Sequence, residues 1–239
     1  MNSTPTRSVV LLSGGMDSCV CAALAVAEDA RAGAQTAAVH VSYGQRTEAR
    51  EKQAFLAICV RLGIRQQLIV RNGALAAIGG SALTDATIAV PESADLGPLG
   101  EIPVTYVPFR NAHFLAVAVS WAEVLGASVI SIGAVEQDSS GYPDCRPAYY
   151  EAYDEVIRTG TKEGNIRIMT PLIAMRKAEI VRRGLELNAP LDLTWSCYSR
   201  DDQACGRCDS CVLRLAAFHG AGAVDPIPYA PHGGIPAKT

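Results

Sequence analysis

The sequence shows no excess of basic residues. It carries 21 Lys and Arg against 24 Asp and Glu, which gives a net charge of −3 over 239 residues. A broad nucleic-acid-binding surface usually requires a basic excess, so we expect no nucleic-acid partner. With 49% hydrophobic and 19% charged residues, the composition excludes general disorder and predicts a protein that buries a sizeable core.

The sequence also has little that would target or span a membrane. The apolar run at residues 9–12 is far too short for the core of a signal peptide. Residues 112–135 are apolar enough to raise a membrane question, but Gly126 divides them into a helical half and a strand-like half. We interpret them as a buried helix–strand unit, and we expect a cytoplasmic protein with no membrane partner.

Apolar, β-rich segments alternate with helical patterns through the first 190 residues. This alternation predicts an α/β fold with a doubly wound parallel sheet and right-handed crossovers. The expected strands are residues 8–12, 36–41, 67–70, 104–107, 129–134 and 167–169. The expected helices are residues 17–30, 47–62, 111–125, 147–159 and 176–187.

Two segments depart from this alternation. Residues 73–100 contain three acids but no Lys or Arg, and we interpret them as an insertion or lid. The tail from Asp225 contains four prolines, so we expect it to wrap the surface or to be partly disordered.

A glycine-rich loop follows the first expected strand, with the sequence Ser13-Gly14-Gly15-Met16-Asp17-Ser18. The glycines allow close approach to an anion, and the next helix directs its free N–H groups toward that anion. Asp17 would repel a bare anion, so it indicates either a bridging Mg²⁺ or a helix cap. The alternative is a tight strand-to-helix turn in which Asp17 or Ser18 is the N-cap.

The loop has neither the lysine of a Walker motif nor the glycine spacing of a dinucleotide-binding motif. It matches at every position the S-G-G-x-D-S loop of the PP-loop ATP pyrophosphatases, and therefore resembles that superfamily. The resemblance implies an enzyme that binds ATP, transfers AMP to a substrate oxygen and releases pyrophosphate. We assign the nucleotide to Leu12, Ser13, Gly14, Gly15, Met16, Asp17, Ser18, Cys19, Val20, Cys21 and Ala22.

Four of the eight cysteines lie within fifteen positions, at Cys197, Cys205, Cys208 and Cys211. Without a secretory signal, this cluster indicates a metal rather than disulfides. Four thiolates with no open position are typical of structural zinc. An iron–sulfur cluster is the alternative, but the ferredoxin pattern places proline after its last cysteine, whereas here Val212 follows Cys211. We therefore expect Zn²⁺.

Further motifs follow in a fixed order. With the loop and the cysteines, they resemble the 7-cyano-7-deazaguanine synthase family of the queuosine pathway over about residues 8–226. One departure is Phe109, where many relatives carry glycine, which bears on the shape of the pocket. The motifs are Tyr43-Gly44-Gln45-Arg46, Tyr106-Val107-Pro108-Phe109-Arg110-Asn111, Gly141-Tyr142-Pro143-Asp144-Cys145-Arg146 and Thr194-Trp195-Ser196-Cys197-Tyr198.

This resemblance implies the ATP-dependent conversion of the carboxylate of 7-carboxy-7-deazaguanine into a nitrile, with ammonia as the nitrogen source. Adenylation makes a carboxylate oxygen a leaving group, ammonia gives an amide, and a second adenylation permits elimination to the nitrile. Charge that develops at the α-phosphate needs fixed positive groups. Arg110 and Lys177 are our candidates, and they form the expected catalytic set with Asp17; otherwise each is an ordinary solvated base.

For the deazaguanine ring, the expected contacts are Asp138, Tyr142, Asp144 and Arg146. A carboxylate can accept both adjacent N–H groups of the ring, and Asp138 and Asp144 flank Tyr142 in a loop after a strand, where ligands of parallel sheets bind. Tyr142 is a stacking candidate, although a single aromatic is more often packing. Cys145 fits a pocket wall better than a nucleophile, because an adenylate route needs no thiol.

We divide the chain into an ATP-binding α/β domain, residues 1–190, and a zinc-binding helical region with the tail, residues 191–239. Two other functions remain open. A tRNA-modifying PP-loop enzyme would need a basic face, but residues 176–214 carry seven bases against six acids. A non-enzymatic nucleotide-binding module would hold ATP without releasing AMP. We expect a small deazapurine and ammonia as partners, and a homodimer is one open oligomeric state.

Overall fold

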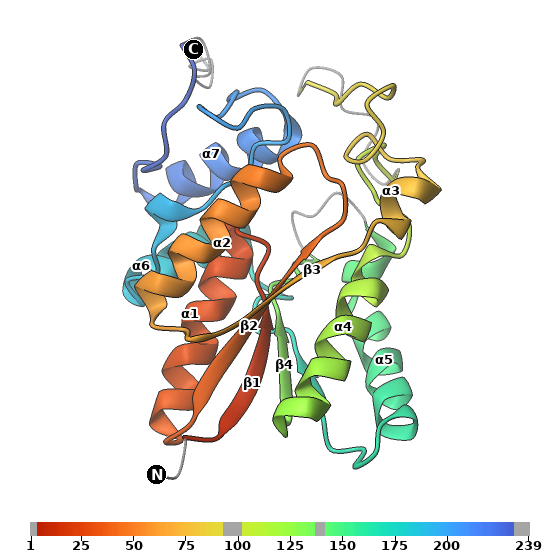
Figure 1. Cartoon of the computed structure of the whole chain (residues 1–239). Coiled ribbons are helices and arrows are strands. Elements are labelled where there is room, and N and C mark those ends of the chain that lie inside the picture. The colour runs from red at the N-terminus through yellow and green to blue at the C-terminus, as the bar shows by residue number, and fades with distance from the viewer. Residues whose placement is uncertain (1–3, 93–101, 137–141, 232–239) are drawn as a thin grey trace.

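Five parallel strands form one sheet in the part of the chain that this computed structural model describes, residues 4–92, 102–136 and 142–231. The strands are β1 (Thr6–Leu11), β2 (Gln35–Ser42), β3 (Gln66–Arg71), β4 (Val129–Ile132) and β5 (Arg167–Met169), and their order is β3-β2-β1-β4-β5 (Figure 1). From β1 the chain first adds β2 and β3 on one side of the sheet, and then returns to add β4 and β5 on the other side. The direction of winding therefore reverses between β1 and β4. The predicted doubly wound α/β fold is confirmed.

Helices cover both faces of this sheet. They are α1 (Met16–Arg31), α2 (Glu48–Leu62), α3 (Ala74–Ile78), α4 (Arg110–Leu125), α5 (Pro147–Gly160), α6 (Lys177–Glu186) and α7 (Asp209–Ala221). Within the described residues, the 3₁₀ turn η2 (Pro143–Cys145) precedes α5, and the 3₁₀ turn η3 (Leu191–Leu193) lies between α6 and α7. Helices α1, α2, α6 and α7 lie on one side of the strands, and α4 and α5 lie on the other (Figure 1).

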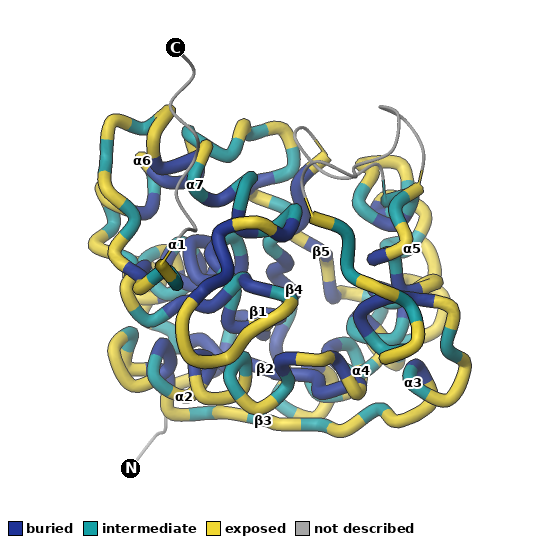
Figure 2. The backbone as a smooth tube through the Cα atoms, turned by 90° about the horizontal axis from the view of Figure 1, so that it is seen from above, coloured by how far each residue is buried: buried dark blue, intermediate teal, exposed yellow. Residues whose placement is uncertain are grey.

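The two layers have separate apolar cores because successive residues of β1 point to opposite faces. Val10 packs with α1, α2 and α6, whereas Val9 and Leu11 pack with α4 and α5. Seen from above, the central strands are enclosed by helices, and exposed residues gather at the periphery (Figure 2). This explains why β1, β2 and β4 are buried on both faces, whereas the edge strand β3 is not.

The apolar segment 112–135 is a helix–strand unit, as predicted. Helix α4 ends at Leu125, Gly126 follows with a φ of 67°, and β4 begins at Val129. A left-handed residue at this position stops a helix, and glycine adopts it without a steric penalty. Among the described residues, no helix is long and apolar enough to cross a bilayer.

The predicted strand at residues 104–107 is wrong. The segment forms a turn, in which the Tyr106 N–H donates to the Pro103 carbonyl at 2.9 Å, and the Val104 carbonyl accepts from the Ala82 N–H at 2.8 Å. Proline lacks an N–H and fixes φ, so a stretch between Pro103 and Pro108 is poorly suited to a ladder. Val107 serves packing instead, in a small core beside α3, whereas Val104 is exposed.

The described part of the tail packs on the protein, in agreement with the first of the two expectations. Ala204 forms an isolated bridge with Tyr229, and its carbonyl accepts from the Ala230 N–H at 2.9 Å. Asp225 pairs with Arg214 on α7, where both side chains are almost fully buried. The end of the described chain is therefore attached to the cysteine-rich region.

Candidate active site

A cavity of about 290 Å³ lies at the carboxyl ends of β1, β2 and β4. Leu11 is level with Val39 on one neighbouring strand and Ile132 on the other, and all three line the cavity floor. Ligands of open parallel sheets bind where the winding reverses, and here that position is between β1 and β4. The fold therefore places a ligand site at this point.

The glycine-rich loop forms one wall of the cavity. Gly14 has a φ of +98°, and a Cβ there would lie 2.6 Å from the Glu51 carbonyl oxygen, so only glycine fits. A Cβ on Gly133, which follows β4, would lie 2.9 Å from the Asp17 backbone. The two glycines thus allow the start of α1 to approach both neighbouring segments.

The start of α1 presents its N–H groups without a side-chain cap. Gly15 is the N-cap residue, and no side chain caps the helix. The Ser18 hydroxyl donates to the Gly15 carbonyl at 2.9 Å and lies 3.0 Å from the Ser13 hydroxyl. The capped-turn alternative is therefore not what the structure shows, and the uncapped helix end can bind an anion.

Asp17 and Lys177 meet at the cavity although they are far apart in sequence. The Lys177 ammonium donates to Asp17 Oδ2 at 2.5 Å, joining the first turns of α6 and α1. The other oxygen, Asp17 Oδ1, is buried and has no partner among the described residues. A buried carboxylate oxygen is costly unless it is paired, so this atom fits the donor set of a divalent cation.

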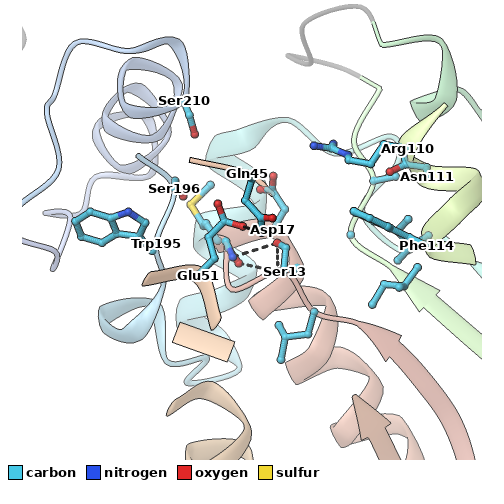
Figure 3. Close-up of a pocket in the computed structure, with 18 of the residues that line it drawn as sticks. Ser13, Asp17, Gln45, Glu51, Arg110, Asn111, Phe114, Trp195, Ser196 and Ser210 are labelled. Atoms are coloured by element: carbon cyan, nitrogen blue, oxygen red, sulfur yellow. Dashed lines mark hydrogen bonds between the residues drawn. The ribbon is translucent and has the colours of Figure 1, made fainter. Parts of the chain in front are cut away.

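Arg110 lies across the cavity from the loop. Its guanidinium donates to the Tyr43 hydroxyl at 3.2 Å and lies 5.7 Å from the ring centroids of both Tyr43 and Phe114. Figure 3 shows Arg110 on one side of the pocket and Trp195 on the opposite side, with Asp17 between them. The three expected catalytic residues therefore line one cavity.

The expected ring contacts are only partly gathered there. Tyr142 lines the cavity, but Arg146 is exposed at the start of α5 and is not part of the lining. Asp144 is 3% exposed, and its carboxylate accepts the Asn111 N–H at 3.0 Å. It holds the first turn of α4 and does not line the cavity. Asp138 lies outside the described residues.

Cys145 is in the cavity wall, where burial raises the pKa of its thiol to about 11. At neutral pH this group is therefore a thiol, whereas a cysteine nucleophile acts as the thiolate. The Asn111 amide lies 3.6 Å from its sulfur. The environment is that of a wall residue.

The four cysteines of the cluster, Cys197, Cys205, Cys208 and Cys211, come together in a small core that also contains Trp195. Their sulfur atoms all lie within 4.8 Å of one another, and all four residues are buried. Zinc–sulfur bonds of about 2.3 Å place tetrahedral sulfurs about 3.8 Å apart, and Cys205 Sγ lies 3.9 Å from Cys211 Sγ. A four-iron cluster binds each thiolate to a different iron and would hold the sulfurs farther apart. The spacing fits one tetrahedral ion.

Backbone N–H groups point at these sulfurs. Those of Ser199 and Cys205 lie 3.4 Å from Cys197 Sγ, and that of Cys208 lies 3.2 Å from Cys205 Sγ. Hydrogen bonds from the thiols of Cys208 and Cys211, together with these N–H groups, lower the pKa of Cys197. The same coupling raises the pKa values of Cys208 and Cys211, so the four thiols together favour one thiolate, at Cys197, and a bound metal would hold the others in the thiolate form.

The cysteine-rich region also supplies the far wall of the cavity. The backbone N–H of Trp195 donates to the Gly14 carbonyl at 2.8 Å, which connects this wall to the glycine-rich loop. Arg214 donates to the Thr194 hydroxyl at 2.7 Å and to the Ser196 hydroxyl at 3.3 Å. A metal in the cluster would therefore stabilise a wall of the site from a distance.

Sequence reasoning missed Glu51, which lines the same cavity. Its two carboxylate oxygens accept from Gln45 Nε2 at 2.9 Å and from the Thr47 hydroxyl at 2.8 Å. One feature of the sequence could have identified it: Glu51 lies in the first turn of the helix that follows the Tyr43-Gly44-Gln45-Arg46 motif.

A parallel sheet with an S-G-G-x-D-S loop after its first strand is the arrangement of the PP-loop nucleotide-binding proteins. Residues 7–222 match the family described as "Queuosine biosynthesis protein QueC". The chain belongs to this family.

Two curated relatives show the extent of the similarity. The 7-cyano-7-deazaguanine synthase of Koribacter versatilis (strain Ellin345) is 70% identical over 227 residues, which cover 94% of each chain. The 7-cyano-7-deazaguanine synthase of Acidobacterium capsulatum is 66% identical over 226 residues, which cover 94% of this chain and 96% of the relative. Among solved structures, the U34-tRNA thiolase NcsA from Methanococcus maripaludis with its [4Fe-4S] cluster matches with a TM-score of 0.46 and 14% identity, covering 83% of this chain and 60% of that chain. That likeness is too weak to bear on function.

Proposed function

We propose that this protein is a 7-cyano-7-deazaguanine synthase, a ligase that converts 7-carboxy-7-deazaguanine and ammonia into the nitrile at the expense of ATP. One observation supports this most strongly: a chain of this family brings Asp17, Lys177 and Arg110 into a single cavity beside an uncapped helix N-terminus. The same residues could bind a nucleotide without reacting, so the products decide the matter.

We assign the ATP phosphates to residues 12–22, the loop and the first turns of α1. Asp17 would hold Mg²⁺ through Oδ1, which is buried and lacks a partner among the described residues. The bound cation supplies positive charge that offsets the charge of the phosphates. Lys177 holds the other carboxylate oxygen and keeps the side chain oriented toward the cavity.

The reaction requires positive charge at the α-phosphate in both adenylations. Lys177 is placed beside the loop and Arg110 across the cavity, so they lie on two sides of the space where an acyl adenylate would form. Fixed charges in a partly enclosed site stabilise a developing charge without reorganisation. We propose that both bind the reacting phosphate group.

For the purine ring, we propose Asp138, Tyr142, Asp144 and Arg146 as the binding segment, with different roles. Tyr142 is at the cavity, where it can pack on the ring. Asp144 acts indirectly, because it positions Asn111, which lines the cavity. The side-chain amide of Asn111 also donates to the Asp144 carbonyl at 2.8 Å. Asp138 is the remaining carboxylate for the ring N–H groups.

We propose Zn²⁺ for the four-cysteine cluster, in a structural role within the region of residues 191–239 that follows the ATP-binding domain of residues 1–190. We also propose that the protein works in the cytoplasm on a free base rather than on RNA. The near-neutral charge balance of residues 176–214 supports this choice.

The test is to incubate the protein with 7-carboxy-7-deazaguanine, ammonium and Mg-ATP and to identify the products by mass spectrometry. We expect the nitrile, AMP and pyrophosphate, and we expect the amide to be accepted as a substrate without ammonium. ADP and phosphate as the only nucleotide products would contradict adenylation. ATP binding without AMP release would support a binding module, and turnover only on RNA would support a tRNA-modifying enzyme.

A further inference from the structure

Glu51 is an acid at the cavity that neither phosphate binding nor adenylation requires. It lies in the first turn of α2, and the backbone carbonyl of the same residue contacts the glycine-rich loop at Gly14. Its side chain lines the cavity with Asp17 and Arg110. In Figure 3 it lies in the centre of the pocket, between the wall of Trp195 and the wall of Arg110.

The partners of Glu51 do not neutralise the charge of its carboxylate. Gln45 Nε2 and the Thr47 hydroxyl each donate one hydrogen bond to it, and both are neutral groups. Within the described residues, no Lys, Arg or His forms an ion pair with Glu51 within 4.0 Å. A carboxylate offers about four acceptor positions, so further lone pairs are open to a donor in the cavity.

The cavity needs such a group because of the nitrogen source. At neutral pH ammonia is present chiefly as ammonium, which has no lone pair and cannot attack an acyl carbon. An ammonium ion is drawn to a carboxylate by its charge, and Glu51 lies in the same cavity as the glycine-rich loop, where the acyl adenylate would form.

We propose that Glu51 binds ammonium and accepts its proton, so that ammonia is released beside the acyl adenylate. This inference rests on the proposed function. The carboxylate of Glu51 takes one proton from ammonium and becomes the acid. The nitrogen lone pair forms the C–N bond, and the C–O bond to AMP breaks with its electron pair. The nitrogen of the new C–N bond then loses a proton to water, which gives the neutral amide. Glu51 releases the proton that it took from ammonium to water before the next turnover.

The electrostatic surroundings of Glu51 suit a base. Burial raises its pKa, and the hydrogen bonds from Gln45 and Thr47 oppose that shift. Of the charged groups that face it, Arg110 on α4 lowers the pKa and Glu48 on α2 raises it. A carboxylate with a raised pKa is a stronger base, which makes proton transfer from ammonium less unfavourable.

Glu51→Gln tests the proposal, because it separates the half-reactions. Adenylation is measured without ammonium, as carboxylate-dependent exchange between pyrophosphate and ATP, and we expect it to stay within about threefold of the wild type. Ammonium-dependent amide formation should fall about 100-fold. Hydroxylamine is uncharged at neutral pH and needs no base, so hydroxamate formation should remain close to the wild-type rate. The deficit with ammonium should shrink as pH rises, since free ammonia increases.

Glu48→Gln is the matched control. Glu48 lies in the same helical turn and accepts the Gly44 N–H at 3.1 Å, but it does not line the cavity. Pyrophosphate exchange and hydroxamate formation by this variant should match the wild type, and its ammonium-dependent rate should fall far less than in Glu51→Gln, because Glu48 only adds to the raised pKa of Glu51.

Several outcomes would overturn the proposal. Loss of pyrophosphate exchange in Glu51→Gln would assign Glu51 to adenylation or cation binding. An equal loss of rate with hydroxylamine would make the role of Glu51 structural. Full activity of Glu51→Gln with ammonium would show that Glu51 is not the base. If instead the wild-type protein shows neither exchange nor nitrile, the proposed function itself fails. Should Glu51→Gln not fold, the wild type supplies the test. At fixed total ammonium, its ammonium-dependent rate should level off above the pKa of Glu51 and fall below it; a rate that instead rises about tenfold per pH unit throughout would show direct use of free ammonia and overturn the proposal.

Discussion

Lys177 and Asp17 are separated by 160 residues, yet the lysine Nζ lies 2.5 Å from the aspartate Oδ2. The pair connects the start of α6 to the start of α1 at the cavity, and both side chains keep partial exposure, 17% and 25%. A pair of this kind adds little to folding, because water screens it. Its value lies in orienting the second oxygen of Asp17.

Asp17→Asn should therefore lower turnover far more than stability. The amide keeps an acceptor for Lys177 but loses the negative charge that a cation requires. We expect kcat to fall about 100-fold or more, with a change in Tm of a few degrees at most. Steady-state pyrophosphate release and thermal unfolding give the two numbers. Asp201→Asn, at an exposed position, is the control and should change neither. Equal losses of activity and stability would assign Asp17 to the fold.

The four-cysteine cluster should contain one zinc ion per chain. Cys208→Ser should abolish binding and lower Tm by about 10 °C or more, because metal-binding energy at such sites is folding energy. No cysteine of the cluster lines the cavity, so the substitution should lower activity only indirectly, by destabilising the cavity wall at Trp195. Metal analysis by mass spectrometry checks the ion. Iron with a visible charge-transfer band would contradict zinc, and so would a metal-free variant with normal stability.

The parts of this site that the sequence predicted are those encoded by short, fixed spacings. The loop at residues 13–18 and the cysteines at residues 197–211 each carry their chemistry within one segment, so their positions in the fold follow from the strand and helix pattern. Glu51 was missed because its place in the cavity depends on how α2 packs against the loop at Gly14. The strand at residues 104–107 was wrong because an apolar segment packs equally well as a turn between prolines.

The role assigned to Asp144 shows the same limit. Its position beside Tyr142 suggested a ring contact, but the carboxylate accepts the Asn111 N–H from the start of α4. Helix N-termini commonly take such acceptors from residues outside the helix. Only the folded chain shows which donor is nearest.

The buried pair of Arg214 and Asp225 should be the strongest single ionic contribution to the packing of the tail. Both side chains are at most 3% exposed, and the Arg214 guanidinium donates to both Asp225 oxygens, at 2.7 and 2.9 Å. Asp225→Ala leaves a buried, unpaired arginine and should cost about 3–5 kcal/mol in the free energy of unfolding. Urea denaturation measures this.

The Arg200–Asp202 pair is the comparison for that experiment. It has a similar distance, 2.8 Å, but its side chains are 46% and 60% exposed. Asp202→Ala should leave the unfolding curve unchanged, because exposed pairs contribute little. If both substitutions cost the same, burial would not be what makes the tail contact important.

His40 should make stability depend on pH. It is 1% exposed on β2, its Nδ1 lies 3.2 Å from the Leu12 carbonyl just before the glycine-rich loop, and its Nε2 has no partner among the described residues. Burial lowers its pKa below the ordinary value of 6.5, against the opposing effect of the Leu12 hydrogen bond. The nearby charges also oppose each other, since Glu48 raises the pKa and Lys52 lowers it.

The direction of the effect follows from proton linkage. Above pH 6.5 His40 is neutral in both the folded and the unfolded chain, so its contribution is fully present. As pH falls below that value, the unfolded chain takes up a proton that the folded chain refuses, and stability declines by up to about 1.4 kcal/mol per pH unit from this group alone. Denaturation in urea at pH 7.5, 6.5 and 5.5 should show the decline. His40→Asn keeps a donor for the Leu12 carbonyl but cannot titrate. The unfolding free energy of this variant should therefore decline less steeply between pH 6.5 and 5.5 than that of the wild type. Identical slopes in the two proteins would mean that His40 accepts a proton in the folded state.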